Sequence, residues 1–245
     1  MAAREESSLR RGASTSVRGA RAPRRAWATG AVALQILWLA VAASPAAITI
    51  SCWDAASEFN DSANPDAANP SGVWSYGWKK TLTDKFFLAL TPYSDPPDRF
   101  GWCNASGFPL ICHSTRAVPT LKDGTNRANV PPHGLAMHPG LNGEYAVLRF
   151  TAPADGTYKV SGQFYAQDDN ATGTTTDVWI LPNNSKTGAF SGKVDYYGGA
   201  KSASFTSTVF QLKKGNTLDF QVGYGANKNY EYDATGLVAL IEKIK

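Results

Sequence analysis

Residues 144–164, EYAVLRFTAPADGTYKVSGQF, decide the fold of this chain. Side chains alternate with period two along both halves of the stretch, and one face carries Ala146, Leu148 and Phe150 in the first half and Tyr158, Val160 and Phe164 in the second. This alternation is typical of strands with one buried face. Between the halves, residues 152–156 (APADG) combine a proline, an aspartate and a glycine, the residues that turns prefer. The stretch therefore predicts a central β-hairpin.

The same pattern recurs further along the chain. Residues 204–212 and 217–223 predict a second strand pair around the turn at 213–216, and residues 237–244, apolar on both faces, predict a strand in the middle of a sheet. Residues 100–139 have five prolines and are expected to be the least regular stretch. With about eight to ten strands and no convincing helix, the sequence predicts an all-β protein, an antiparallel β-sandwich or jelly roll.

An export leader precedes this domain. Seven arginines and two glutamates give residues 1–25 a net charge of +5, residues 26–43 are almost entirely apolar, and small residues follow. This order predicts a secretory signal peptide over residues 1–46, with cleavage after Ala43 or Ala46, and a β-sandwich domain over residues 52–245. An uncleaved membrane anchor is the alternative. Either way the domain is expected to be secreted or extracytoplasmic, touching a membrane only through an uncleaved leader.

The leader also accounts for the positive charge of the chain. The whole chain has a net charge of +4, so residues 26–245 have a net charge of −1 after the leader's +5 is subtracted. Binding to nucleic acid needs a basic face on the folded domain. The charge distribution therefore argues against a nucleic-acid partner.

The three cysteines are Cys52, Cys103 and Cys112. In an exported domain Cys103 and Cys112 could form a disulfide that closes a short loop, which leaves Cys52 single. Their spacing is not that of a metal site.

Several segments resemble a domain of exported bacterial proteins, some of which end in a PEP-CTERM sorting signal. The segments are NPSGVWSYGW (69–78), HPG (138–140), YAVLRFTAP (145–153), GTY (156–158), TDV (176–178) and DATGL (233–237). The resemblance covers about residues 53–245.

That domain is in turn similar to the galactose-binding-like jelly rolls used as carbohydrate-binding modules. Residues 152–158 and 212–220 carry this second likeness. Many such modules hold a structural calcium where the first and last strands meet. The resemblance therefore implies a calcium site with Asp54 or Glu58 and Asp233 as ligands, which are hard oxygen donors of the kind calcium prefers.

Aromatic and amide side chains in loops suggest how a glycan could be bound, because aromatic rings stack on sugars and amides bond hydroxyl groups. The candidate ligand-binding residues are Trp102, Tyr196, Tyr197, Asn227, Asn229 and Tyr230. Trp74 and Tyr76, at strand spacing, are instead expected in the core. The ordinary alternative is that loop tyrosines simply rim the sandwich.

The sequence contains no nucleophile elbow, zinc-protease or phosphate-binding motif. Carboxylates such as Asp168, Asp169, Asp177 and Asp195 could pair as in a glycosidase, but the sequence gives no separation between them. We therefore expect a non-catalytic, extracytoplasmic carbohydrate-binding (lectin-like) module whose partner is a glycan or polysaccharide. The alternatives are a structural or adhesive surface domain that binds a protein and, further off, a polysaccharide hydrolase.

Overall fold

The computed structural model describes residues 51–64, 72–95, 99–117, 128–170, 172–187 and 189–245. The chain divides into two units, Met1–Ala46 and Ala47–Lys245, and every described residue belongs to the second. The leader lies outside the described residues. No helix in the described ranges is long and apolar enough to cross a membrane.

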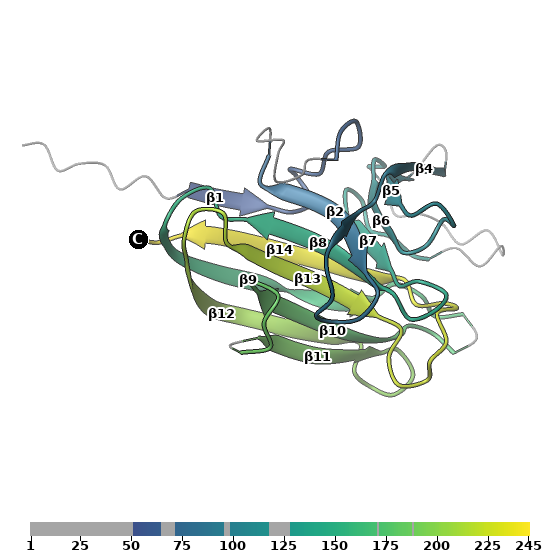
Figure 1. Cartoon of the computed structure of the whole chain (residues 1–245). Helices are drawn as coiled ribbons and strands as arrows, with labels where there is room; N and C mark the ends of the chain where they lie inside the picture. Colours follow the sequence, from purple (N-terminus) through teal and green to yellow (C-terminus); the bar gives the residue numbers. More distant parts are fainter. Residues whose placement is uncertain (1–50, 65–71, 96–98, 118–127, 171, 188) are drawn as a thin grey trace, which may run out of the picture. The chain divides into compact units, whose positions relative to one another are not determined.

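The second unit is an all-β sandwich of two antiparallel sheets, without a helix among the described residues (Figure 1). One sheet has the order β12-β9-β14-β7-β6-β5-β4, with β1 also paired to β14. Its strands are β1 (Ser51–Asp54), β4 (Thr91–Asp95), β5 (Arg99–Cys103), β6 (Leu110–Ser114), β7 (Leu135–His138), β9 (Gly156–Ala166), β12 (Ser202–Leu212) and β14 (Thr235–Lys243).

The second sheet has the order β11-β10-β13-β8-β2-β3. Its strands are β2 (Trp74–Lys79), β3 (Phe87–Leu88), β8 (Tyr145–Thr151), β10 (Thr175–Pro182), β11 (Phe190–Asp195) and β13 (Thr217–Gly223). The two sheets confirm the predicted β-sandwich.

The predicted central hairpin is wrong in its pairing, although both of its strands exist. β8 pairs with β2 and β13, whereas β9 pairs with β12 and β14 in the other sheet. The turn after Thr151 therefore crosses from one sheet to the other. Period two shows which face of a strand is buried, and the faces of β8 and β9 pack on one core from opposite sides.

The predicted pair of β12 and β13 is also a crossing between the sheets. The two crossing turns bind each other: Ala152 N donates to Asn216 O (2.8 Å), Gly215 N donates to Ala152 O (2.9 Å), and Lys214 N donates to Asp155 Oδ1 (2.7 Å). The similar turn chemistry of the two segments thus serves one shared structure at this end of the sandwich.

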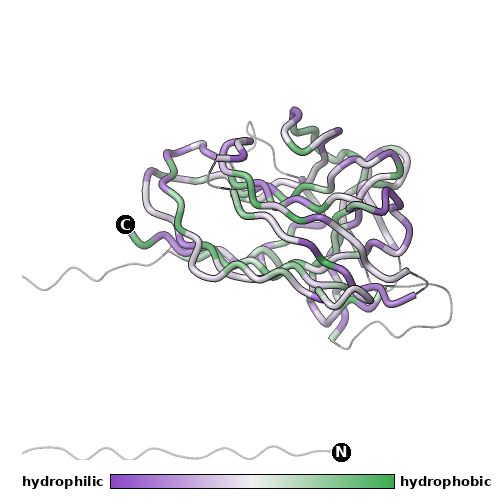
Figure 2. Tube along the Cα trace, turned by 90° about the horizontal axis from the view of Figure 1, so that it is seen from below, coloured by the Kyte–Doolittle hydropathy of each residue, from purple (hydrophilic) through white to green (hydrophobic). Residues whose placement is uncertain are grey.

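The core fills the space between the sheets, and polar and apolar residues alternate along the strands (Figure 2). Phe150 is fully buried, with its ring centroid 5.4 Å from that of Trp53, 5.3 Å from that of Trp74 and 5.8 Å from that of Tyr158. Trp74 and Tyr76 are buried, as expected. β14 lies between β9 and β7 within its sheet, which confirms its central position.

The described part of residues 100–139 is more regular than expected, because it contains β6, β7 and all but the first residue of β5. These strands have four or five residues each, and their pairing partners supply much of their stability. Their inward side chains, among them Trp102, Ile111, Leu135 and Met137, join the core. The outward side chains Cys103, Leu110, Cys112 and Ala136 form a second buried cluster with Ala128, Val130 and Ala234.

Replacing Phe150 with alanine should lower the free energy of unfolding by about 3–5 kcal/mol, because the ring is fully buried among other aromatic rings. Urea unfolding followed by tryptophan fluorescence measures this loss. Val209→Ala, at a side chain that is 52% exposed, is the control and should change stability by less than about 0.5 kcal/mol. Equal losses in both variants would contradict this description of the core.

Candidate functional site

A pocket of about 360 Å³ lies on the outer face of the eight-stranded sheet. Its floor is formed by the outward side chains of β6 and β7, Leu110, Cys112 and Ala136, which alternate with the core residues Ile111, Leu135 and Met137. The volume is near the lower end of the range for small-ligand sites. The floor is apolar and belongs to paired strands, so it is a rigid surface.

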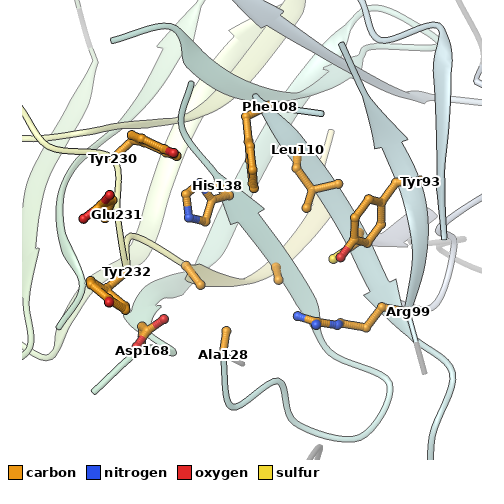
Figure 3. A pocket seen from close by; sticks show the side chains of 13 residues that line it. Tyr93, Arg99, Phe108, Leu110, Ala128, His138, Asp168, Tyr230, Glu231 and Tyr232 are labelled. Carbon is orange, nitrogen blue, oxygen red and sulfur yellow. The ribbon is translucent and has the colours of Figure 1, made fainter. Parts of the chain in front are cut away.

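Four aromatic side chains line the pocket (Figure 3). Tyr93 comes from β4, Phe108 from the loop between β5 and β6, and Tyr230 and Tyr232 from the loop between β13 and β14. The ring centroids of Phe108 and Tyr230 are 5.9 Å apart, while Tyr93 lies on the far side of the floor. Loops from distant parts of the chain thus supply rings around one floor.

The loop that carries Tyr230 is fixed by its own polar residues. Asn227 Nδ2 donates to Thr175 Oγ1 (2.6 Å), and its Oδ1 accepts from Asn229 N (3.2 Å). At the end of the loop the buried carboxylate of Asp233 accepts from Thr175 N (2.7 Å) and Thr175 Oγ1 (3.1 Å). The start of β10 therefore holds the loop in place beside the pocket.

Polar groups of both signs enter the pocket. Arg99, which is 9% exposed, pairs with Asp95 through its terminal nitrogen, while its buried Nε has no hydrogen-bond partner among the described residues. Asp168 is buried and its Oδ1 accepts from Asn170 N and Nδ2, both at 2.9 Å; Glu231 is exposed. A buried donor without a partner is costly unless something completes it.

His138 stands at one side of the pocket with its ring centroid 4.6 Å from that of Phe108 and 5.9 Å from that of Tyr230. Burial lowers the pKa of His138 to about 4, so the ring is neutral at physiological pH, and its Nδ1 donates to Pro139 O (3.0 Å). Burial also raises the pKa of the Cys112 thiol to about 12. Neither group is therefore charged in the folded protein near pH 7.

The structure brings one of the six predicted ligand-binding residues, Tyr230, into the pocket. Asn227 and Asn229 shape its loop. Tyr196 and Tyr197 lie together on the next loop, with ring centroids 5.0 Å apart, and do not line the pocket. The Tyr197 hydroxyl donates to Asp169 O, beside the pocket residue Asp168.

Trp102 is not an exposed stacking residue. It is 8% exposed and belongs to the core, and its indole Nε1 donates to Asn60 O (2.8 Å). In β5 Trp102 alternates with the outward residues Gly101 and Cys103, and this register turns its side chain inward.

The three predicted calcium ligands do not fit one shared ion. Asp54 Oδ1 accepts from Ala56 N and Ser57 N, and Glu58 Oε2 accepts from Trp74 Nε1. Asp54 is in register with Leu240, whereas Asp233 precedes Thr235 at the other end of β14, and the strand from Thr235 to Leu240 alone spans roughly 17 Å at about 3.3 Å per residue. The described residues hold no cluster of three or more histidine, cysteine or acidic side chains suited to a metal.

The predicted disulfide is absent: Cys103 and Cys112 are both buried free thiols, and Cys52 is free and exposed. Cys112 is in register with Gly101 and Cys103 with Leu110, so the two cysteines are diagonal neighbours across β5 and β6. Diagonal neighbours are about 7–8 Å apart, beyond the reach of an unstrained disulfide.

Sequence patterns alone did not identify four of the pocket residues, Tyr93, Arg99, Phe108 and His138. The alternation of residues along β5 indicates that Arg99 faces outward with Gly101 and Cys103, opposite to Phe100 and Trp102. The alternation does not indicate which strands lie beside β5. The pocket therefore combines aromatic rings and an apolar floor with a donor, Arg99, and an acceptor, Asp168. Such a lining can bind a ligand that has both apolar faces and hydroxyl groups.

Comparisons with known proteins find partial likenesses only. No protein-family model matches the chain, and no curated protein is similar to it in sequence. Among solved structures, a family 35 carbohydrate-binding module of Cellvibrio japonicus Abf62 is 13% identical and has a TM-score of 0.30, covering 54% of this chain and 91% of its own.

Two further solved structures give similar values. A family 35 carbohydrate-binding module from Clostridium thermocellum is 17% identical with a TM-score of 0.28, covering 50% of this chain and 83% of its own. Pika GITRL is 11% identical with a TM-score of 0.25, covering 40% of this chain and 77% of its own. At such values these likenesses decide nothing about function, and the fold class rests on the strand pairing itself.

Asp233 should make the protein less stable as the pH rises from about 4 to about 7. Burial raises the pKa of this carboxyl to about 7 from an ordinary value of 3.8, so the unfolded chain loses the proton first. The contribution of Asp233 to the free energy of unfolding is complete below the pKa of the unfolded chain. It falls by about 1.4 kcal/mol per pH unit until the pH reaches the pKa of the folded protein. Asparagine cannot ionise. The free energy of unfolding of Asp233→Asn should therefore rise relative to that of the wild type as the pH increases across this range.

Urea unfolding at several pH values measures the difference between the Asp233→Asn variant and the wild type, which cancels the opposite contribution of His138. Asp61→Asn, at an exposed carboxylate, is the control and should follow the wild type. A difference that stays constant between pH 4 and pH 7 would show that Asp233 is ionised in the folded protein.

Proposed function

We propose that the pocket on the outer face of the eight-stranded sheet binds a glycan, and that the domain is a non-catalytic carbohydrate-binding module. The observation that carries this proposal is the set of aromatic rings around an apolar floor, together with the polar side chains of Arg99 and Asp168 in the same pocket. Sugars offer apolar ring faces to aromatic side chains and hydroxyl oxygens to donors of this kind. The pocket supplies both types of contact at once.

The leader predicted from the sequence favours an extracytoplasmic setting for this activity, in which the partner is a polysaccharide or a surface glycan. The alternative of a structural or adhesive domain predicts that the same aromatic rings pack against a protein. A hydrolase is a further alternative, because Asp168 and Glu231 both line the pocket. Release of reducing ends from a bound polysaccharide, lost in Asp168→Asn, would favour the hydrolase.

Tyr230→Ala should weaken glycan binding at least about tenfold, equivalent to about 1.4 kcal/mol, because it removes one of the rings that line the pocket. Glycan arrays and pull-down with insoluble polysaccharides would identify the ligand, and titration calorimetry would measure the loss. Tyr197→Ala is the matched control: this tyrosine is 63% exposed but lies outside the pocket, so binding should be unchanged.

A larger loss in Tyr197→Ala than in Tyr230→Ala would move the binding face to the loop between β11 and β12. Absence of binding to every glycan by correctly folded protein would rule out the carbohydrate-binding function. Repeating the titration with calcium and with a chelator tests the calcium that the resemblance implies, independently of the pocket.

Arg99→Lys should also weaken binding, by roughly 1.5–3 kcal/mol, the usual value of a hydrogen bond to a charged group. Lysine keeps the positive charge beside Asp95 but has no atom equivalent to the guanidinium Nε. Circular dichroism and urea unfolding would show that the variant folds. Unchanged affinity in a folded Arg99→Lys protein would mean that the Nε does not contact the ligand.

A further inference from the structure

A buried ionic group lies on the outer face of the six-stranded sheet, on the opposite layer from the glycan pocket. Lys79 ends β2 and Asp219 lies in β13, and the side chains of both are fully buried. Lys79 Nζ is 2.7 Å from Asp219 Oδ2. Arg149 in β8 forms two hydrogen bonds to the same carboxylate, Nε to Oδ1 at 2.6 Å and its terminal nitrogen to Oδ2 at 2.8 Å.

The amine of Lys79 has a second close neighbour, the side-chain amide of Asn184. Lys79 Nζ donates to Asn184 Oδ1 at 2.7 Å, although the two residues are 105 positions apart. Gln221, with its amide turned to satisfy both partners, accepts from the same Nζ at 3.0 Å and donates to Leu82 O at 3.2 Å. The amine is therefore held between a carboxylate and two carboxamides.

The carboxamide of Asn184 is itself held in a fixed orientation. Asn184 lies in the turn between β10 and β11 with a positive φ of 60°, and its Nδ2 donates to Thr83 O (2.6 Å) and Asp84 O (3.3 Å). The carbonyl oxygen therefore faces the amine, and the amide nitrogen faces the surface segment that follows β2. This orientation directs a departing nitrogen away from the amine.

Burial of this amine favours its neutral, nucleophilic form. Desolvation lowers the pKa of Lys79, with Arg149 acting in the same direction, although the neighbouring Asp219 opposes the shift. Desolvation activates lysine nucleophiles in the same way elsewhere. Groups held at contact distance also react far faster than groups that must meet in solution.

We propose that Lys79 and Asn184 become joined by an intramolecular amide bond, an isopeptide cross-link, with Asp219 as the proton carrier. Asp219 takes a proton from the Lys79 ammonium, and the freed lone pair of Nζ attacks Cγ of Asn184. A proton then passes from Nζ through the carboxyl group to Nδ2, the bond from Cγ to Nδ2 breaks, and ammonia leaves with the proton first removed, as ammonium. No electrons are transferred, so the reaction needs no oxidant, reductant or cofactor.

The cross-link would join two parts of the six-stranded sheet that are not neighbours. β2 and β10 are separated by β8 and β13 in the strand order, so the bond would span the sheet. It would also fix the segment after β2 to the turn between β10 and β11. A bond of this kind would resist unfolding without any disulfide, and all three cysteines of this chain are free thiols.

Mass spectrometry of the intact, folded protein tests the proposal. The protein should be lighter than its sequence by the mass of one ammonia, and tryptic digestion should give a branched peptide that joins the segments around Lys79 and Asn184. Lys79→Arg should restore the full mass, after allowance for the substitution, because arginine remains protonated. Lys80→Arg, at the exposed neighbouring residue, is the matched control and should keep the mass loss.

Cyclisation of Asn184 to a succinimide would also release ammonia, and it must be distinguished. A succinimide would persist in Lys79→Arg and would be cleaved by hydroxylamine, whereas the cross-link would do neither. Full sequence mass in the folded wild-type protein, unchanged after prolonged incubation, would overturn the proposal. So would a mass loss that survives in Lys79→Arg. Neither result bears on glycan binding, which is measured at the opposite sheet.

Discussion

The packing of one core by two sheets is the constraint on which the rest of this structure depends. Phe150 of β8 and Tyr158 of β9 are eight positions apart in sequence, belong to opposite sheets, and meet with ring centroids 5.8 Å apart. Aromatic burial of this size dominates the energetics of a core. Because the strands on both sides of the crossing turns bury their apolar faces here, their other faces must point outward on two separate layers.

The outer faces of the two sheets differ in structure. On the eight-stranded sheet, the short strands place small apolar side chains at the floor of a pocket, and loops from β5–β6, β9–β10 and β13–β14 add rings and polar groups around them. On the six-stranded sheet, the segment after β2 covers the strands and encloses Lys79, Asp219 and Arg149. Buried charges of this kind persist only when hydrogen bonds satisfy them, as they do here. The first face has a pocket lined by aromatic rings. The second face buries an ionic group beside a further pocket of about 350 Å³ that Phe86 and Arg149 line.

The sequence predicted the parts of the fold that are local. Alternation in residues 144–164 identified both strands and their buried faces, and the aromatic spacing of Trp74 and Tyr76 identified core residues. It could not tell a hairpin from a crossing between sheets, because a strand buries the same face in either arrangement. The predicted disulfide between Cys103 and Cys112 was wrong for a related reason. Whether two cysteines can pair depends on the strand register, and their spacing in the sequence does not determine that register.

The candidate site shows the same division between local and long-range information. Tyr230 could be found from its loop alone, since an aromatic residue among turn-forming residues is exposed unless the fold covers it. The prediction that Trp102 binds a ligand was wrong, because β5 turns this side chain into the core. Arg99 could not be identified as a pocket residue, because only the fold brings Tyr93, Phe108 and Asp168 around it. A lone arginine in a sequence is an ordinary surface residue. It becomes informative only when the strand order buries its side chain beside the aromatic rings and apolar floor of the pocket and leaves its Nε without an acceptor among the described residues, because buried polar groups normally have a partner.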